Sequence, residues 1–285
     1  MLSPHRVYML AADHRRQWEE WCDARSIPRA RIAEAKRLAL DAFLLARDRS
    51  TAVREYGALL VDEQYASAVI ADAMNAGVTV GTPAEKAGAF PLAWATEPLE
   101  RALTGAFVKV LVRYRPDDDE GIVQEQWAHL EALQAWCRRE GKPLVVEVLV
   151  SRRQEPEDEF EASGRPAMLA GFIGAASRRG VSPEFWKIEG TLSREGARRI
   201  DRAIAADPGC RQIILGKAAD LATIDRWFAA AAASTTAVGF AIGRSLFWEA
   251  SAAFLAGATT ADQAAADIAA NYLQLVDAWQ RSRAE

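Results

Sequence analysis

Eight short apolar runs, most of them rich in Val, Ile and Leu, alternate along the chain with longer amphipathic stretches. Such runs are typical of parallel strands buried on both faces, and the stretches between them are typical of helices that cover the sheet. Eight strand–helix units in succession predict an α/β fold, a single (β/α)8 TIM barrel. The predicted strands are residues 7–12, 58–61, 78–81, 108–112, 144–149, 185–189, 212–215 and 238–242, and the predicted helices are residues 28–46, 65–76, 120–140, 166–179, 193–206, 220–232, 246–255 and 260–280.

Size and composition agree with one barrel domain spanning residues 1–285. Half of the residues are apolar and 26% are charged, which provides a sizeable core, and barrels of this class often run to about 250 residues. The net charge is -4 and no long run of Lys or Arg occurs, so binding to nucleic acid or to an anionic membrane is disfavoured. The first residues show no signal-peptide pattern, and no apolar span of about 20 residues is present that could cross a membrane. The three cysteines form no CxxC motif, which is typical of a protein from a reducing compartment. We therefore expect a cytoplasmic protein without a membrane span.

Three charged residues interrupt predicted strands that should be buried on both faces. Lys109, Glu147 and Lys187 lie in the fourth, fifth and sixth strands, and Lys and Glu are almost never buried unless they are paired. The alternation of side chains along a strand allows both lysines to point into the barrel, with Glu147 between them. Two interpretations are open at this point. The three side chains could form a structural ion cluster, or one lysine beside a second cation could supply a neutral amine nucleophile.

Further polar residues and glycines follow the predicted strands, at the end where barrel enzymes place their active sites. Gly243 and Arg244 follow the eighth strand, where barrels commonly bind phosphate, and Arg244 offers a bidentate donor. Gly216 after the seventh strand lets a ligand approach the backbone closely. The remaining candidates near this rim are Asp13, Arg15, Arg113 and Lys217.

Other chemistries find less support in the sequence. The only histidines are His5, His14 and His129, and His129 falls within a predicted helix, so a zinc site with three ligands is disfavoured. No nucleophile elbow, GxGxxG or GxxxxGK[ST] motif occurs. We therefore expect no metal and no nucleotide cofactor.

Five segments in order carry a family resemblance: residues 11–15, 108–118, 146–148, 185–189 and 239–247. Together they resemble the DUF2090 family, the aldolase domain often fused behind 5-dehydro-2-deoxygluconokinase in bacterial myo-inositol catabolism and related to the class I tagatose-1,6-bisphosphate aldolases. The resemblance extends over essentially the whole chain. No kinase half is present, so no ATP site is implied.

The resemblance implies a class I aldolase that cleaves 6-phospho-5-dehydro-2-deoxy-D-gluconate to dihydroxyacetone phosphate and malonate semialdehyde. Lys187, in the Trp-Lys motif, is then expected to form the Schiff base. Lys109, Glu147 and Asp13 match the other catalytic positions. Gly243 and Arg244 match the phosphate site. Alternatives are a class I aldolase for another ketose phosphate, such as a tagatose-bisphosphate or a sulfo-sugar phosphate, and a barrel that binds a sugar phosphate without cleaving it.

Two positions depart from the family pattern. Arg115 stands where a histidine is expected, and Lys217 stands where an apolar residue is expected. We interpret both as extra positive charge at the rim, which indicates a more anionic substrate than usual or a different anion. Because related aldolases are often oligomers, a homo-oligomer is compatible with the resemblance.

Overall fold

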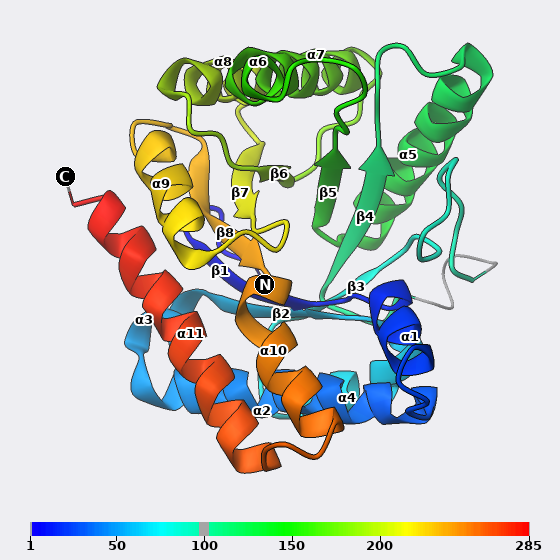
Figure 1. The fold of residues 1–285 in the computed structure, drawn as a ribbon. Helices are drawn as coiled ribbons and strands as arrows, with labels where there is room; N and C mark the ends of the chain where they lie inside the picture. The colour runs from blue at the N-terminus through cyan, green and yellow to red at the C-terminus, as the bar shows by residue number, and fades with distance from the viewer. Residues whose placement is uncertain (1, 97–102, 285) are drawn as a thin grey trace.

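The computed structural model describes residues 2–96 and 103–284, which form a closed barrel of parallel strands surrounded by helices (Figure 1). Each strand pairs with its neighbours in the chain, and β8 closes the barrel against β1. This confirms the predicted single (β/α)8 barrel. The strands are β1 (Val7–Ala12), β2 (Gly57–Val61), β3 (Val80–Pro83), β4 (Phe107–Arg113), β5 (Leu144–Leu149), β6 (Phe185–Glu189), β7 (Arg211–Leu215) and β8 (Ala237–Ile242).

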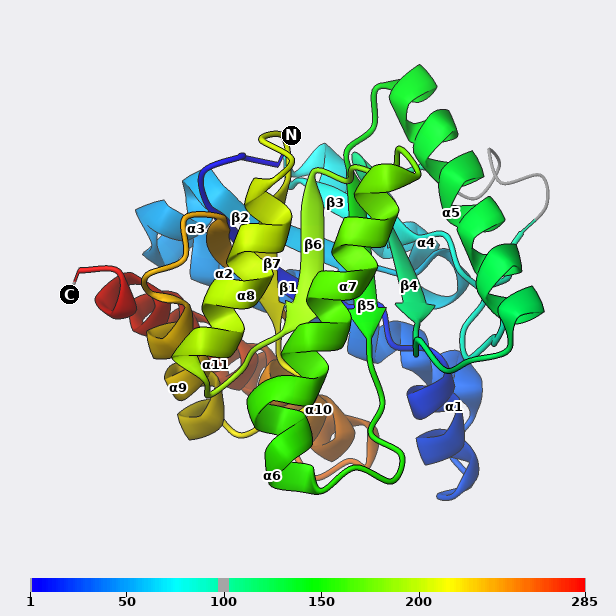
Figure 2. The same ribbon diagram turned by 90° about the horizontal axis from the view of Figure 1, so that it is seen from above.

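The helices form the outer layer, and the view from above shows them around the barrel (Figure 2). They are α1 (Arg16–Asp23), α2 (Ile32–Arg49), α3 (Thr51–Tyr56), α4 (Glu63–Asn75), α5 (Glu120–Glu140), α6 (Glu157–Glu159), α7 (Arg165–Arg178), α8 (Arg194–Ala205), α9 (Leu221–Ala231), α10 (Arg244–Leu255) and α11 (Ala261–Ser282), with a short 3-10 turn at Arg29–Arg31 and a π turn at Phe160–Gly164. Within residues 2–96 and 103–284, no helix is both long enough and apolar enough to cross a membrane.

Capping residues explain where several helices begin. Asp62, Asp119, Ser193, Asp220 and Thr260 each accept a hydrogen bond from a backbone N–H in the first turn of the helix that follows. Such bonds satisfy N–H groups that have no partner inside the helix. The observed helix starts therefore lie close to those predicted from the sequence.

An apolar layer closes the barrel below the carboxyl ends of its strands. Its members include Met9, Phe107, Val145, Phe185 and Ile213, all of them at most 2% exposed. Because side chains on one face of a strand recur every second residue, the next inward positions on β4, β5 and β6 are those two residues further along. This apolar layer is the floor of the barrel interior. The next inward positions on β4, β5 and β6 therefore lie directly above the floor, towards the carboxyl ends of the strands.

The third strand and the first helices differ from the sequence predictions. The predicted strand 78–81 is found at Val80–Pro83, because the Val78 N–H bonds to the Ala73 carbonyl and so belongs to the turn that ends α4. The predicted helix 28–46 begins as a 3-10 turn and continues to Arg49. Helices α1 and α3 were not predicted, since eight and six residues are too short for a clear helical period.

Gly239 has a close backbone neighbour that no other residue would tolerate. Its φ is +157°, and a Cβ at this position would lie 1.7 Å from the Val7 carbonyl oxygen of the neighbouring strand. We expect Gly239→Ala to lower the free energy of unfolding by about 3 kcal/mol or more, through overpacking and backbone strain. Denaturant unfolding measures this loss.

The matched control is Gly171→Ala on α7, where a Cβ would meet nothing within 4 Å. This substitution should raise the free energy of unfolding by about 0.5–1 kcal/mol, because alanine loses less backbone entropy than glycine in a helix. Equal effects of the two substitutions would contradict the steric explanation for Gly239.

Candidate active site

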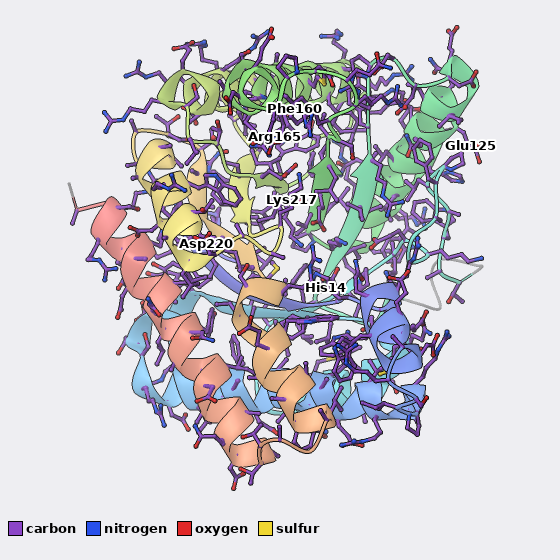
Figure 3. All side chains as sticks on the ribbon, in the orientation of Figure 1. His14, Glu125, Phe160, Arg165, Lys217 and Asp220 are labelled. Atoms are coloured by element: carbon purple, nitrogen blue, oxygen red, sulfur yellow. The ribbon has the colours of Figure 1, made fainter. Side chains whose placement is uncertain are left out.

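A polar cavity opens at the carboxyl ends of the barrel strands, with an empty volume of about 980 Å³ that includes the solvent at its mouth. Figure 3 shows two of its lining residues, His14 and Lys217, near the centre of the barrel. The cavity brings together every catalytic and substrate-binding residue predicted from the sequence. Its lining includes Asp13, His14, Arg15, Glu85, Lys109, Arg113, Glu147, Lys187, Gly216, Lys217, Gly243 and Arg244.

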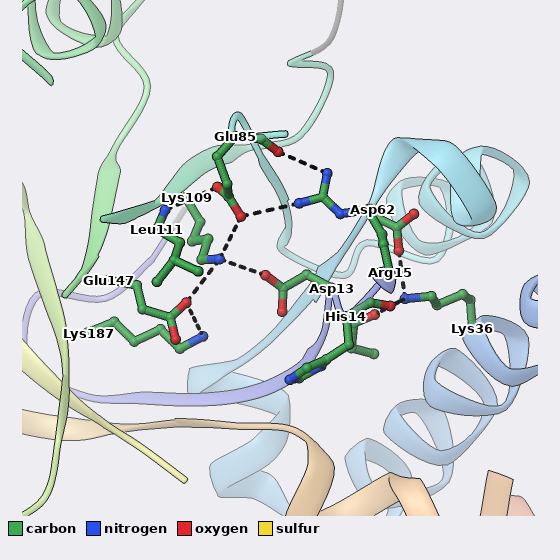
Figure 4. Close-up of polar contacts among 11 residues, drawn as sticks. Asp13, His14, Arg15, Lys36, Asp62, Glu85, Lys109, Leu111, Glu147 and Lys187 are labelled. Carbon is green, nitrogen blue, oxygen red and sulfur yellow. Dashed lines mark hydrogen bonds and ion pairs between the residues drawn. The ribbon is translucent and has the colours of Figure 1, made fainter. Parts of the chain in front are cut away.

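Two buried lysines and three carboxylates form an ion cluster at the base of this cavity (Figure 4). Lys109 Nζ lies 3.0 Å from Asp13 Oδ2, 2.9 Å from Glu85 Oε1 and 2.9 Å from Glu147 Oε2. Lys187 Nζ lies 3.0 Å from the same Glu147 oxygen. The predicted Lys109–Glu147–Lys187 cluster is therefore confirmed, while its catalytic role stays a prediction.

Strand register explains why these side chains meet. Glu147 and Lys187 are directly paired across β5 and β6, and they lie two residues beyond Val145 and Phe185 of the apolar floor. Lys109 stands in the same relation to Phe107 on β4. Two-residue alternation therefore turns all three charged side chains into the barrel, directly above the floor.

The two lysines differ in the number of carboxylates around them. Burial alone would lower the pKa of Lys109, but Asp13, Glu147 and Glu85 together raise it well above its usual range. Burial likewise favours the neutral forms of the two acids, yet the neighbouring Lys109 and Lys187 ammonium groups hold the pKa of Asp13 well below normal and that of Glu147 below normal. Lys109 is thus fixed as a cation, whereas Lys187 contacts only Glu147 among these carboxylates.

Glu85 is the member of the cluster that sequence reasoning missed. Its Oε1 accepts hydrogen bonds from Lys109 and from Arg15, and its Oε2 accepts one from the Leu111 N–H. It also links the site to Arg15, whose Nη1 donates to the Glu85 carbonyl. The third strand ends at Pro83 rather than at residue 81, so Glu85 is the second residue after the end of the strand. With the correct strand end, a charged residue at that position would have indicated a site residue.

His14 lies beside the cluster as a neutral imidazole. Burial lowers its pKa to about 3; nearby Asp13 opposes this shift, and Lys36, Lys187 and Arg244 reinforce it. Its Nδ1 is buried and has no hydrogen-bond partner within residues 2–96 and 103–284. The side chain therefore offers the cavity an uncharged donor or acceptor.

The low pKa of His14 predicts a pH-dependent loss of stability. The unfolded chain binds a proton at His14 below pH 6.5, whereas the folded protein binds it only near pH 3. Protonation therefore stabilises the unfolded state relative to the folded state as the pH falls between these values. We expect the free energy of unfolding to fall by up to about 1.4 kcal/mol per pH unit on this account. Denaturant unfolding between pH 6.5 and about 5.5 separates this effect from that of the carboxyl groups, whose ordinary pKa values of 3.8 for Asp and 4.5 for Glu lie below this window. His14→Gln should flatten the slope, and an unchanged slope would contradict the assignment.

Backbone packing shapes the side of the cavity that is formed by the ends of β7, β8 and β1. A Cβ on Gly243 would lie 1.9 Å from the Ala11 carbonyl oxygen, and one on Gly216 would lie 2.9 Å from Ile242 Cγ2. Arg244 follows as the first residue of α10, and its Nε is buried without a hydrogen-bond partner in the described part of the chain. A helix N-terminus next to an arginine with an unused donor suits an anionic group.

The remaining predicted substrate-binding cations already have partners. Lys217 Nζ lies 2.5 Å from Glu189 Oε1, the Arg15 guanidinium pairs with Glu85, and Arg113 Nη1 donates to the Gly88 carbonyl. All three line the cavity. Each must share or exchange its present contact in order to hold a substrate.

Arg115 does not add free positive charge to the rim, contrary to the interpretation of its departure from the family pattern. It is buried, pairs with Asp117 at 2.7 Å and with Glu155 at 2.6 Å, and is absent from the cavity lining within the described residues. Lys217 lines the cavity but is paired with Glu189, whose Oε1 it shares with Arg165. Asp117 lies in the same segment as Arg115, whereas Glu155 and Glu189 come from other segments of the chain.

Fold and site together define a (β/α)8 barrel with a lysine–carboxylate cluster at the base of a cavity between its strand ends. The chain belongs to the bacterial family described as "Uncharacterized protein conserved in bacteria (DUF2090)", whose model matches residues 3–283. No curated protein sequence matches it. Among solved structures, the chain is similar to fructose-bisphosphate aldolase from Plasmodium falciparum, solved in complex with TRAP and a small-molecule inhibitor. The TM-score is 0.68 at 12% identity, over 96% of this chain and 89% of that chain. At this identity the likeness concerns the fold.

Proposed function

We propose that this protein is a class I aldolase, a carbon–carbon lyase in which Lys187 forms a Schiff base with a phosphorylated ketose. One observation carries the proposal. Lys187 shares Glu147 with a second lysine that is held as a cation by three carboxylates. An amine next to a fixed cation and a carboxylate has the neighbours that nucleophilic attack on a ketone and the accompanying proton transfers require. The fold shared with a fructose-bisphosphate aldolase supports the same proposal.

The proposed substrate is 6-phospho-5-dehydro-2-deoxy-D-gluconate, and the reaction needs no cofactor. Lys187 passes a proton to Glu147, 3.0 Å away, and the neutral amine attacks the C5 ketone. Glu147 returns the proton to the departing hydroxyl group, so that water leaves and an iminium ion forms. Glu147 removes the C3 hydroxyl proton, the C3–C4 bond breaks, and its electron pair passes to C4 as an enamine. Malonate semialdehyde leaves, C4 gains the proton that Glu147 took up, and water hydrolyses the resulting iminium to dihydroxyacetone phosphate and free Lys187.

The other cavity residues take supporting roles in this proposal. Lys109 and Asp13 keep a fixed charge pattern around Glu147 and polarise a substrate hydroxyl. Arg244, with the backbone near Gly216 and Gly243, holds the phosphate. Arg113, Arg15 or Lys217 holds the carboxylate at the other end of the substrate.

A substrate panel tests this assignment against its nearest alternative. We expect 6-phospho-5-dehydro-2-deoxy-D-gluconate to give the highest kcat/KM, and tagatose-bisphosphate or a sulfo-sugar phosphate to be cleaved much more slowly. A reversed order would keep the Schiff-base chemistry but move the enzyme to another ketose phosphate. Binding of all these ligands without cleavage would favour a sugar-phosphate-binding barrel.

A further inference from the structure

A second buried ion pair lies directly behind the candidate active site. Lys36 projects from α2, and its Nζ lies 2.6 Å from Asp62 Oδ2, with the two side chains 1% and 0% exposed. The same nitrogen donates to the Ala12 carbonyl at 2.5 Å and to the His14 carbonyl at 2.6 Å. These are the two residues on either side of Asp13. Figure 4 shows Lys36 reaching the end of β1 from the side opposite the cluster.

The location of this pair is informative because burying two charges is costly. Well-packed apolar residues often replace a buried ion pair with no loss of stability, and burial lowers the pKa of Lys36 even though Asp62 opposes the shift. Neither Lys36 nor Asp62 lines the cavity among the described residues, so neither is placed to touch a substrate. Their contacts instead converge on the backbone that carries Asp13.

We propose that Lys36 and Asp62 are positioning residues: by fixing the carbonyls on both sides of Asp13, they hold its carboxylate against Lys109. The inference rests on the proposed function, because it assigns a role in that reaction. The chain of contacts runs from Asp62 to Lys36, then through the backbone of residues 12–14 to Asp13, and from Asp13 Oδ2 across 3.0 Å to Lys109 Nζ.

Asp62 also explains how the pair is itself held in place. Its Oδ1 accepts a hydrogen bond from the Tyr65 N–H and caps α4, while Oδ2 faces Lys36. The helix start therefore fixes the carboxylate, and the carboxylate fixes the ammonium group. In a cluster whose charges must line up, a displacement of about 1 Å can cost on the order of 10²-fold in rate.

The test uses the double variant Lys36→Met/Asp62→Asn, which leaves no unpaired charge buried and keeps an amide oxygen to cap α4. We expect kcat to fall by about 10- to 100-fold with KM nearly unchanged, because alignment is lost while the phosphate contacts remain. Should the double variant fold poorly, Lys36→Gln/Asp62→Asn repeats the measurement, since it also leaves no charge buried and replaces the ammonium group with a shorter neutral side chain.

Lys142→Met is the matched control. Lys142 Nζ also bridges two carbonyls that lie two residues apart, those of Leu103 and Gly105 at 2.5 and 2.9 Å, but next to the amino-terminal end of β4. If Lys36 acts only as a general backbone anchor, both variants should lose stability while keeping their kcat, or lose kcat equally. Either result would overturn the proposal.

A crystal structure of the double variant separates this inference from the proposed function. Loss of the 3.0 Å contact between Asp13 and Lys109 is expected. If the wild-type protein proves inactive on every sugar phosphate but this contact is lost in the variant, the positioning role stands and the proposed reaction fails. Retention of the contact with wild-type kcat would refute the positioning role while leaving the aldolase proposal intact.

Discussion

Lys187→Met is expected to abolish turnover, lowering kcat by at least about 10⁴-fold. Methionine has a similar volume but cannot form an iminium ion, so the electron sink for C–C cleavage is lost. Glu147 would still pair with Lys109 at 2.9 Å, so the cluster should survive and the protein should fold. Steady-state kinetics and ligand binding on the same preparation measure the two effects separately.

Lys86→Met is the control for Lys187, because Lys86 also lines the cavity but is exposed and has no role in the proposed reaction. It should retain kcat close to the wild-type value. A different result would be that the wild-type protein cleaves no sugar phosphate and that Lys187→Met binds sugar phosphate as well as the wild-type protein does. This result would favour the alternative that the barrel binds a sugar phosphate without cleaving it.

Glu147→Gln should have the second-largest effect, a decrease in kcat of about 10²- to 10⁴-fold, the usual contribution of a general acid–base group. Burial would raise the pKa of Glu147, but Lys109 and Lys187 outweigh it and hold the pKa below normal. The carboxylate is thus ionised at neutral pH and ready to accept the C3 hydroxyl proton. Glutamine keeps the shape of the side chain but cannot take up that proton.

Glu155→Gln serves as the control, since Glu155 is a paired carboxylate on the rim that contacts Arg115 rather than the cavity. It should leave kcat near the wild-type value. The defect of Glu147→Gln should appear in kcat more than in KM, because the proton transfer occurs after binding. A defect confined to KM would assign Glu147 to substrate binding instead.

Local patterns were sufficient to predict the barrel and much of its charged cluster. The eight apolar runs fixed the strand–helix order, and the charges at Lys109, Glu147 and Lys187 stood out because their strands are buried on both faces. Since two-residue alternation decides which way a strand residue points, both lysines could be directed into the barrel without knowledge of tertiary contacts.

The partners of those residues could not be predicted in the same way. Lys36 lies within an amphipathic helix, where a lysine usually faces solvent, and only the packing of α2 against the barrel brings it to the end of β1. Glu85 was missed because the third strand ends two residues later than predicted. The neutralisation of Arg115 by Glu155 depends on two loops that are distant in sequence. Each case is a tertiary contact, which local periodicity does not encode.

Borohydride reduction in the presence of dihydroxyacetone phosphate tests the central claim most directly. Hydride converts an iminium ion to a stable secondary amine, so intact mass and peptide mapping can locate the reacting lysine. The proposed mechanism predicts one adduct, on Lys187, and none in Lys187→Met. Absence of an adduct while dihydroxyacetone phosphate demonstrably binds, or an adduct on Lys109 instead, would contradict the assignment of Lys187 as the Schiff-base residue.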